Sequence, residues 1–125
     1  MVNKQDYLNS FNQDIDIVRG DTLCFDFQLI GLGSRQQYED LEVVFAVADR
    51  YDGSIMLVSE NGNGINLEAY DITTDTATFS VTVTPEKTVE LDLSRYFYDL
   101  KIKTSDDVVT LMRGYFTLLF ETRKG

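Results

Sequence analysis

Residues 22–30 read TLCFDFQLI, and this stretch decides the fold class. Every second position carries a large apolar side chain, and small or polar residues fill most of the positions between. Successive side chains of an extended chain point to opposite faces, so one face of this segment is apolar. The repeated period of two predicts a half-buried β-strand. The apolar face consists of Leu23, Phe25, Phe27 and Leu29.

The same alternation returns along most of the chain and predicts an all-β protein. Turn signals separate the alternating segments, at Asp52-Gly53, at Asn61–Gly64 and at Pro85. Residues 31–37 predict a loop, and residues 86–89 predict one helical turn. About eight strands at this spacing are typical of an antiparallel β-sandwich. The segments read as further strands are 14–18, 41–50, 54–60, 65–73, 76–84, 95–103 and 108–122.

A chain of 125 residues fits one domain. Residues 1–12 are polar and aperiodic and predict an N-terminal arm, and residues 13–125 predict the sandwich domain. The first residues lack the apolar core of a signal peptide, and no run of 18 apolar residues occurs. We therefore expect synthesis and folding in a reducing cytosol.

Charge narrows the classes of partner. The chain has 21 acidic and 11 basic residues, for a formal net charge of −10. Such a charge repels nucleic-acid phosphates and anionic membrane surfaces. We expect neither nucleic acid nor membrane as a partner.

The residues for common catalytic sites are absent. The sequence has no histidine and one cysteine, Cys24, which excludes Ser-His-Asp and Cys-His catalysis, the usual zinc sites and an internal disulfide. Acid pairs such as Asp14 and Asp16 arise by chance in so acidic a chain, and no pattern places two acids in an apolar cleft. Calcium binding stays open, because loop acids and Asn61 or Asn63 supply the oxygen ligands that calcium prefers. We predict no enzyme activity, no cofactor and no metal.

Arg19, Gly20 and Asp21 form an Arg-Gly-Asp tripeptide, which has two readings. It is an adhesion signal where it projects from a long loop, and here it lies between two alternating segments. Gly20 can take the positive φ of a tight turn, and the β-branched Thr22 suits the start of the next strand. We predict a structural turn made by Arg19, Gly20, Asp21 and Thr22.

Three motifs follow one another along residues 13–123. They are the turn at Arg19–Thr22, then Tyr96, Tyr98, Asp99 and Leu100, and then Thr110, Leu111, Gly114 and Phe116. On these motifs, the chain resembles the small N-terminal domain of tailed-phage upper baseplate proteins and related tail or fibre adaptors. The resemblance implies an immunoglobulin-like β-sandwich of about 7–9 strands. Because upper baseplate proteins continue into a long helical or fibrous part, it implies either a stand-alone adaptor or a module of something longer.

The resemblance implies a non-enzymatic virion protein of the baseplate, tail or neck. Its partners would be other virion proteins, in a homo-oligomer or another symmetric assembly. The candidate contact residues are Tyr7, Leu8 and Phe11 in the arm, and the outward apolar side chains Phe97, Tyr115 and Leu119.

A carbohydrate- or receptor-binding module is the alternative function. Such a module needs a shallow groove with exposed aromatic rings and acids. Tyr38, Tyr51 and Tyr70, which lie close to predicted loops, are the candidate rings.

Overall fold

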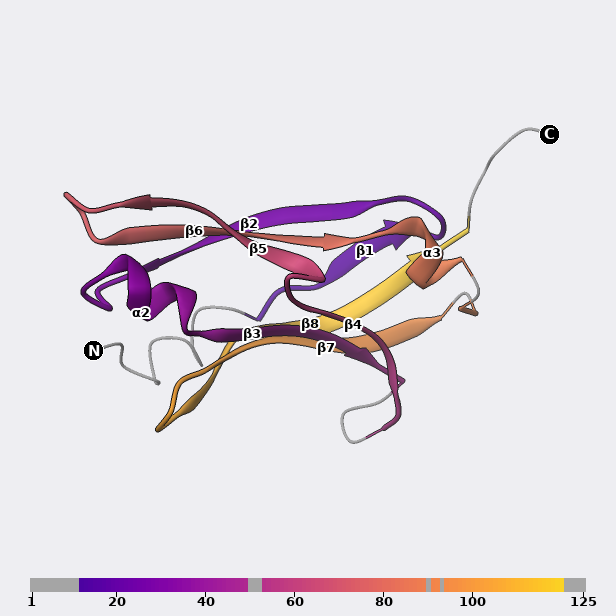
Figure 1. The fold of residues 1–125 in the computed structure, drawn as a ribbon. Coiled ribbons are helices and arrows are strands. Elements are labelled where there is room, and N and C mark those ends of the chain that lie inside the picture. Colours follow the sequence, from indigo (N-terminus) through magenta and orange to yellow (C-terminus); the bar gives the residue numbers. More distant parts are fainter. Residues whose placement is uncertain (1–11, 50–52, 90, 93, 121–125) are drawn as a thin grey trace.

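The structure is a computed structural model and describes residues 12–49, 53–89, 91–92 and 94–120. These residues form eight strands and two short helices, which confirms the all-β class (Figure 1). The strands are β1 (Ile15–Val18), β2 (Leu23–Ile30), β3 (Glu42–Ala48), β4 (Ile55–Asn61), β5 (Gly64–Asp71), β6 (Thr76–Val83), β7 (Arg95–Lys103) and β8 (Val108–Leu119). The helices are α2 (Arg35–Glu39) and α3 (Pro85–Thr88).

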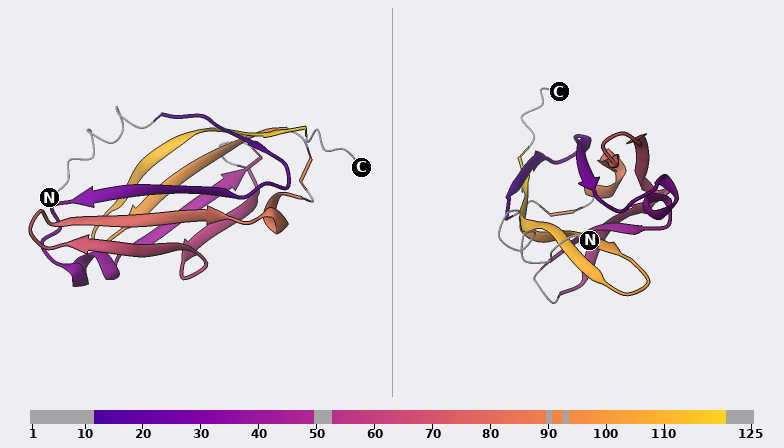
Figure 2. Two further views of the ribbon diagram at one scale, coloured as in Figure 1. Left: turned by 90° about the horizontal axis from the view of Figure 1, so that it is seen from above. Right: turned by 90° about the vertical axis from the view of Figure 1, so that its left-hand side faces the viewer.

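All eight strands belong to one hydrogen-bonded sheet, in the order β1-β8-β7-β3-β4-β5-β6-β2. The sheet folds over on itself, so that β2, β5 and β6 form a layer that faces β3, β7 and β8 (Figure 1). Seen from above, the strands of the two layers cross obliquely (Figure 2). Each layer therefore has one face toward the other layer and one face toward solvent.

The prediction of a purely antiparallel arrangement is wrong at two strand pairings. β1 runs parallel to β8, and β4 is parallel to β5 over two residue pairs. The turn at residues 19–22 connects β1, the first strand in this order, to β2, the last strand. The tight turn expected at Asn61–Gly64 is present, because Glu60 and Asn63 exchange backbone hydrogen bonds of 3.0 and 2.8 Å, and Gly62 and Gly64 have positive φ. It leads into the other layer, so β4 and β5 do not pair as an antiparallel hairpin. Side chains alternate with the same period in both kinds of pairing, so alternation does not reveal strand direction.

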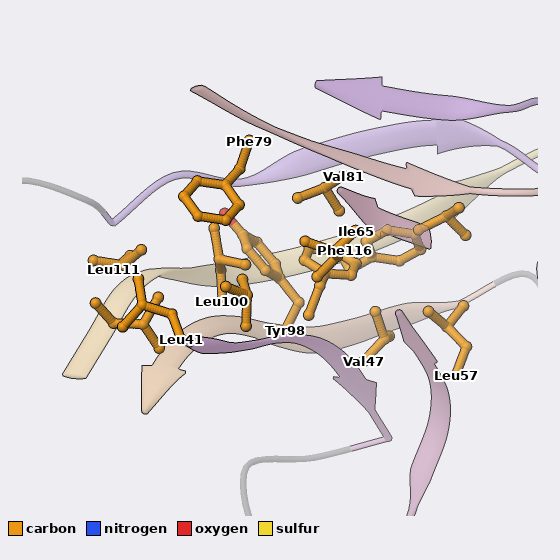
Figure 3. Packing of buried hydrophobic residues seen from close by; sticks show 14 of the residues in the cluster. Leu41, Val47, Leu57, Ile65, Phe79, Val81, Tyr98, Leu100, Leu111 and Phe116 are labelled. Atoms are coloured by element: carbon orange, nitrogen blue, oxygen red, sulfur yellow. The ribbon is translucent and has the colours of Figure 1, made fainter. Parts of the chain in front are cut away.

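The apolar faces predicted from alternation meet in a single core. The alternate residues of β3, β6 and β7 are at most 5% exposed, and they include Phe45 and Tyr98. Phe79 and Val81 of β6 point toward Tyr98, Leu100 and Phe116 of the opposite layer (Figure 3). The predicted inward faces of these strands are therefore confirmed.

Helix α2 corrects the prediction of a loop over residues 31–37. Ser34 precedes the helix in an extended conformation, and its hydroxyl accepts a hydrogen bond from the Gln37 N–H, as an N-cap residue does. With five residues, the helix is too short to show a helical period in the sequence. The second helix, α3, lies within a residue of the predicted turn at 86–89.

The segment before β1 crosses β8 at Gly114. The Gln13 N–H donates to the Arg113 carbonyl over 2.9 Å, and the Tyr98 hydroxyl donates to the Gln13 carbonyl. A Cβ atom on Gly114 would lie far inside van der Waals contact with the Gln13 carbonyl oxygen. Glycine at this position therefore lets two backbone segments approach closely.

We predict that Gly114→Ala lowers the free energy of unfolding by about 1–3 kcal/mol, the usual cost of overpacking. The added methyl group meets backbone, which cannot swing aside as a flexible side chain could. Urea denaturation measures the change, with Thr117→Ala on the same strand as the control for a change at a half-exposed site. Equal stability of Gly114→Ala and wild type would contradict the close crossing.

Tyr98 also makes the free energy of unfolding depend on pH in the alkaline range. Burial, with a smaller effect of the Asp14 charge, raises the pKa of Tyr98 to about 12. The unfolded phenol has a pKa of about 10, so the unfolded chain loses this proton first. The stabilisation is therefore complete below about pH 10 and is lost as the pH rises toward 12. We predict a shallower alkaline loss of stability for Tyr98→Phe in urea denaturation, and equal slopes would contradict this origin.

Candidate functional site

The two solvent faces of the folded sheet differ in chemistry. On the outer face of β2, β5 and β6, small hydroxyl side chains of β6 bond to neighbouring strands. Gln28 Nε2 donates to Thr78 Oγ1 over 3.2 Å, and Ser80 Oγ donates to Glu68 over 2.8 Å. This face is polar, and its groups satisfy one another.

The outer face of β3, β4, β7 and β8 contains an apolar hollow of about 480 Å³. Its floor is formed by Val44, Ala46 and Ala48, the outward side chains of β3. The two alanines are short, so a depression remains between Phe97 of β7 and Ile55 of β4, which are the cross-strand partners of Ala48. We call this feature the β3 hollow.

An aromatic pair borders the β3 hollow. Phe97 and Tyr115 are cross-strand partners, and their ring centroids lie 5.2 Å apart. The Arg95 guanidinium stands over the Tyr115 ring, 4.7 Å from its centroid, in a cation–π contact. This stack of three side chains holds the Tyr115 ring upright at the surface, where it is 37% exposed.

Basic side chains gather around the β3 hollow. Seven basic residues lie within the described part of the chain, and four of them are on this face. Their nearest ion pairs, Lys101 with Asp99 at 3.6 Å and Lys103 with Glu42 at 4.0 Å, are solvent-exposed and so contribute little stability. The four are Arg95, Lys101, Lys103 and Arg113. Three of them, Lys101, Lys103 and Arg113, line the hollow together with one acid, Asp99, so the rim is more basic than acidic in a chain with net charge −10. An apolar floor with such a rim indicates a surface for an acidic and partly apolar partner.

The predicted contact residues fall in different places. Phe97 and Tyr115 stand at the β3 hollow, as outward apolar residues of neighbouring strands. Leu119 is 41% exposed at the end of β8, beyond this aromatic pair. The arm residues Tyr7, Leu8 and Phe11 lie outside the described residues.

The floor of the hollow was missed in the sequence, although a signal was present. The outward positions of β3 are Val44, Ala46 and Ala48, where a half-buried strand would carry polar residues. A strand that is apolar on both faces exposes apolar surface on its outer side, which another part of the chain or a partner can cover. The depth of the hollow depends on which residues of β4 and β7 stand beside the alanines. Alternation alone does not predict this, because it does not report the register between neighbouring strands.

The rings proposed for carbohydrate binding do not form an exposed groove. Tyr38 is fully buried, and its hydroxyl donates to the Asp75 carbonyl over 2.9 Å and accepts from the Leu32 N–H over 3.1 Å. Tyr70 packs on it at 5.5 Å and donates to the Asp75 carboxylate. Both rings anchor the β5–β6 connection to the α2 loop, and Tyr51 lies outside the described residues.

The Arg-Gly-Asp tripeptide forms a turn that packs on the domain. The Asp21 N–H donates to the Val18 carbonyl over 3.0 Å, and Gly20 has a φ of 91°. This is the pattern of a type II turn, which needs glycine at its third position. The Arg19 guanidinium donates to the Leu91 carbonyl, and the Gly20 N–H donates to Thr88 Oγ1. Arg19 is thus directed at the domain, which removes the basis for the adhesion reading.

Two of the side chains considered for catalysis or calcium, Asp14 and Asn61, have structural roles. Asp14 accepts a hydrogen bond from the Tyr115 N–H over 3.0 Å. The Asn61 side chain accepts from the Val43 N–H and donates to the Leu41 carbonyl, which fixes the start of β3. Over the residues that the structure describes, no three acidic or thiol side chains gather as a metal site would require.

No protein-family model matches this sequence, and no curated protein matches it. The helices within the described residues are too short and polar to span a membrane. The function is therefore inferred from the β3 hollow, its rim and the sequence.

Proposed function

We propose that the chain is a non-enzymatic structural module of a phage particle, placed in the baseplate, tail or neck. It is made in the host cytoplasm and acts in the virion by contact with its own copies as well as with other virion proteins. The observation that carries this proposal is the β3 hollow, an apolar depression with a mainly basic rim on a strongly acidic chain. The net charge of −10 disfavours a nucleic acid or an anionic membrane, and an apolar depression suits a side chain of a protein partner.

An immunoglobulin-like sandwich is the architecture that we propose for this module. The strands β4-β3-β7-β8 and β5-β6-β2 are neighbours in the order that variable-type immunoglobulin sheets have, with β1 added beside β8. Near the start of β7, the Tyr96 hydroxyl donates to the Asp92 carbonyl over 2.8 Å, the bond of a tyrosine corner. These two features support the proposal independently of the sequence resemblance.

The centre of the proposed sandwich is held by aromatic rings. Antibody domains place a tryptophan against a disulfide between the two sheets, with the second cysteine two residues after the corner tyrosine. Here Tyr98 stands two residues after Tyr96, and Phe45 packs against both Tyr98 and Phe25. Contacts between aromatic rings thus join the two sheets where antibody domains have a disulfide. This arrangement suits a protein that folds in a reducing compartment, where disulfides are rare.

Blocking the hollow tests the proposed function. We predict that the wild-type chain self-associates as its concentration rises and that Ala46→Lys, which puts a long charged side chain on the floor, abolishes this. The matched control is Thr82→Lys, which adds the same charge on the outer face of β6. Light scattering coupled to size-exclusion chromatography measures the masses, and circular dichroism checks the fold of each variant.

Two results would contradict the proposal. One is a wild-type chain that stays monomeric at every concentration. The other is an association that Thr82→Lys and Ala46→Lys weaken equally, because the hollow would then have no special part in it.

A further inference from the structure

We infer that the β3 hollow of one copy receives the tip of the β5–β6 hairpin from a second copy, so that the chains join head to tail. This rests on the proposed function and names the partner of the same site. The hairpin tip is residues 71–75, between the end of β5 and the start of β6.

An apolar side chain projects from this hairpin tip. Ile72 is 81% exposed, the most exposed large apolar residue in the described part of the chain. Ile30, 61% exposed, ends β2 opposite Thr76, the residue that follows the tip. An isoleucine so far from the core has no packing role in its own chain, and it fits a depression floored by valine and alanine.

The hairpin tip is more acidic than the rim of the hollow. Asp71 is exposed beside the isoleucine, and Asp40 is exposed at the end of α2. Asp75 is half-buried in the tip, and Glu39 pairs with Arg35 at 2.9 Å. Helix α2 and the β5–β6 connection lie at the same end of the molecule (Figure 1). An acidic end with an apolar projection complements an apolar hollow with a basic rim.

Hydrogen bonds hold the hairpin tip in shape before any contact is made. The Asp75 carboxylate accepts from the Gly33 N–H over 2.7 Å and from the Tyr70 hydroxyl over 2.9 Å. The Asp71 carboxylate accepts from the Thr73 N–H, two residues on. A tip that is already ordered loses little conformational entropy on docking, which favours association.

The occupant is a second copy because one chain cannot bring these surfaces together. The hollow lies on the outer face of β3, β4, β7 and β8, and the tip ends the hairpin of the opposite layer (Figure 1). The two surfaces also differ from each other, so the contact is heterologous, and a pair of copies retains a free hollow on one copy and a free tip on the other. Such contacts build rings or filaments, the forms of repeating particles.

Two variants with complementary defects test the inference. Ala46→Lys blocks the hollow and leaves the tip, whereas Ile72→Lys removes the apolar projection and leaves the hollow. Each alone should associate at least roughly tenfold more weakly than wild type, the change that 1.4 kcal/mol produces. An equimolar mixture should form dimers and nothing larger, because each pair has one intact hollow and one intact tip. Val89→Lys, at an exposed apolar residue after α3, is the control and should behave as wild type.

The outcomes separate this inference from the proposed function. If Ile72→Lys assembles like wild type while Ala46→Lys does not, the hollow has another occupant, and the head-to-tail contact is wrong although the proposed function stands. The same holds if removal of residues 1–11 abolishes assembly and Ile72→Lys does not. If the wild type and Val89→Lys are both monomeric throughout, the proposed function fails as well.

Discussion

The contact of Phe45 with rings from both layers is the interaction on which the rest of the structure depends. Its centroid lies 5.8 Å from Phe25 of β2, 5.4 Å from Tyr98 of β7 and 6.3 Å from Phe116 of β8. Aromatic pairs of this kind contribute about 0.5–1.5 kcal/mol each beyond their buried area. Because β2 and β8 lie near opposite ends of one sheet, these contacts require the sheet to fold over. No disulfide is available to do so in a chain with one cysteine.

Side chains alternate between the two faces of each strand. The residues that face the core therefore determine which residues face solvent. The threonines and serine of β6 are turned outward into a polar face that is satisfied by its own hydrogen bonds. The alanines of β3 are turned outward as well, and the register with β4 and β7 places them between Ile55 and Phe97. The β3 hollow thus results from the same alternation that builds the core. Apart from Ser59 and Thr88, the side chains buried among the described residues are apolar.

The sequence predicts the buried faces well and the arrangement of strands less well. Val43, Phe45 and Val47 are buried as their spacing indicates, since alternation reports directly on which face is apolar. The parallel pairing of β1 with β8 was missed, because strand direction and order depend on contacts distant in sequence. Tyr38 appeared to be a loop residue near solvent, and a five-residue helix instead buries it. Phe97 and Tyr115 were recognised as outward residues, but the hollow beside them needs the register of four strands.

We propose that this protein makes contact through the outer face of β3, β4, β7 and β8. Amine-specific labelling, read residue by residue with mass spectrometry, distinguishes a covered face from an open one. On passing from dilute to concentrated protein, labelling of Lys101 and Lys103 should slow several-fold as their face is covered. Lys87, whose ammonium group donates to the Val58 carbonyl, should label at an unchanged rate. Association with no change at Lys101 and Lys103 would contradict the claim.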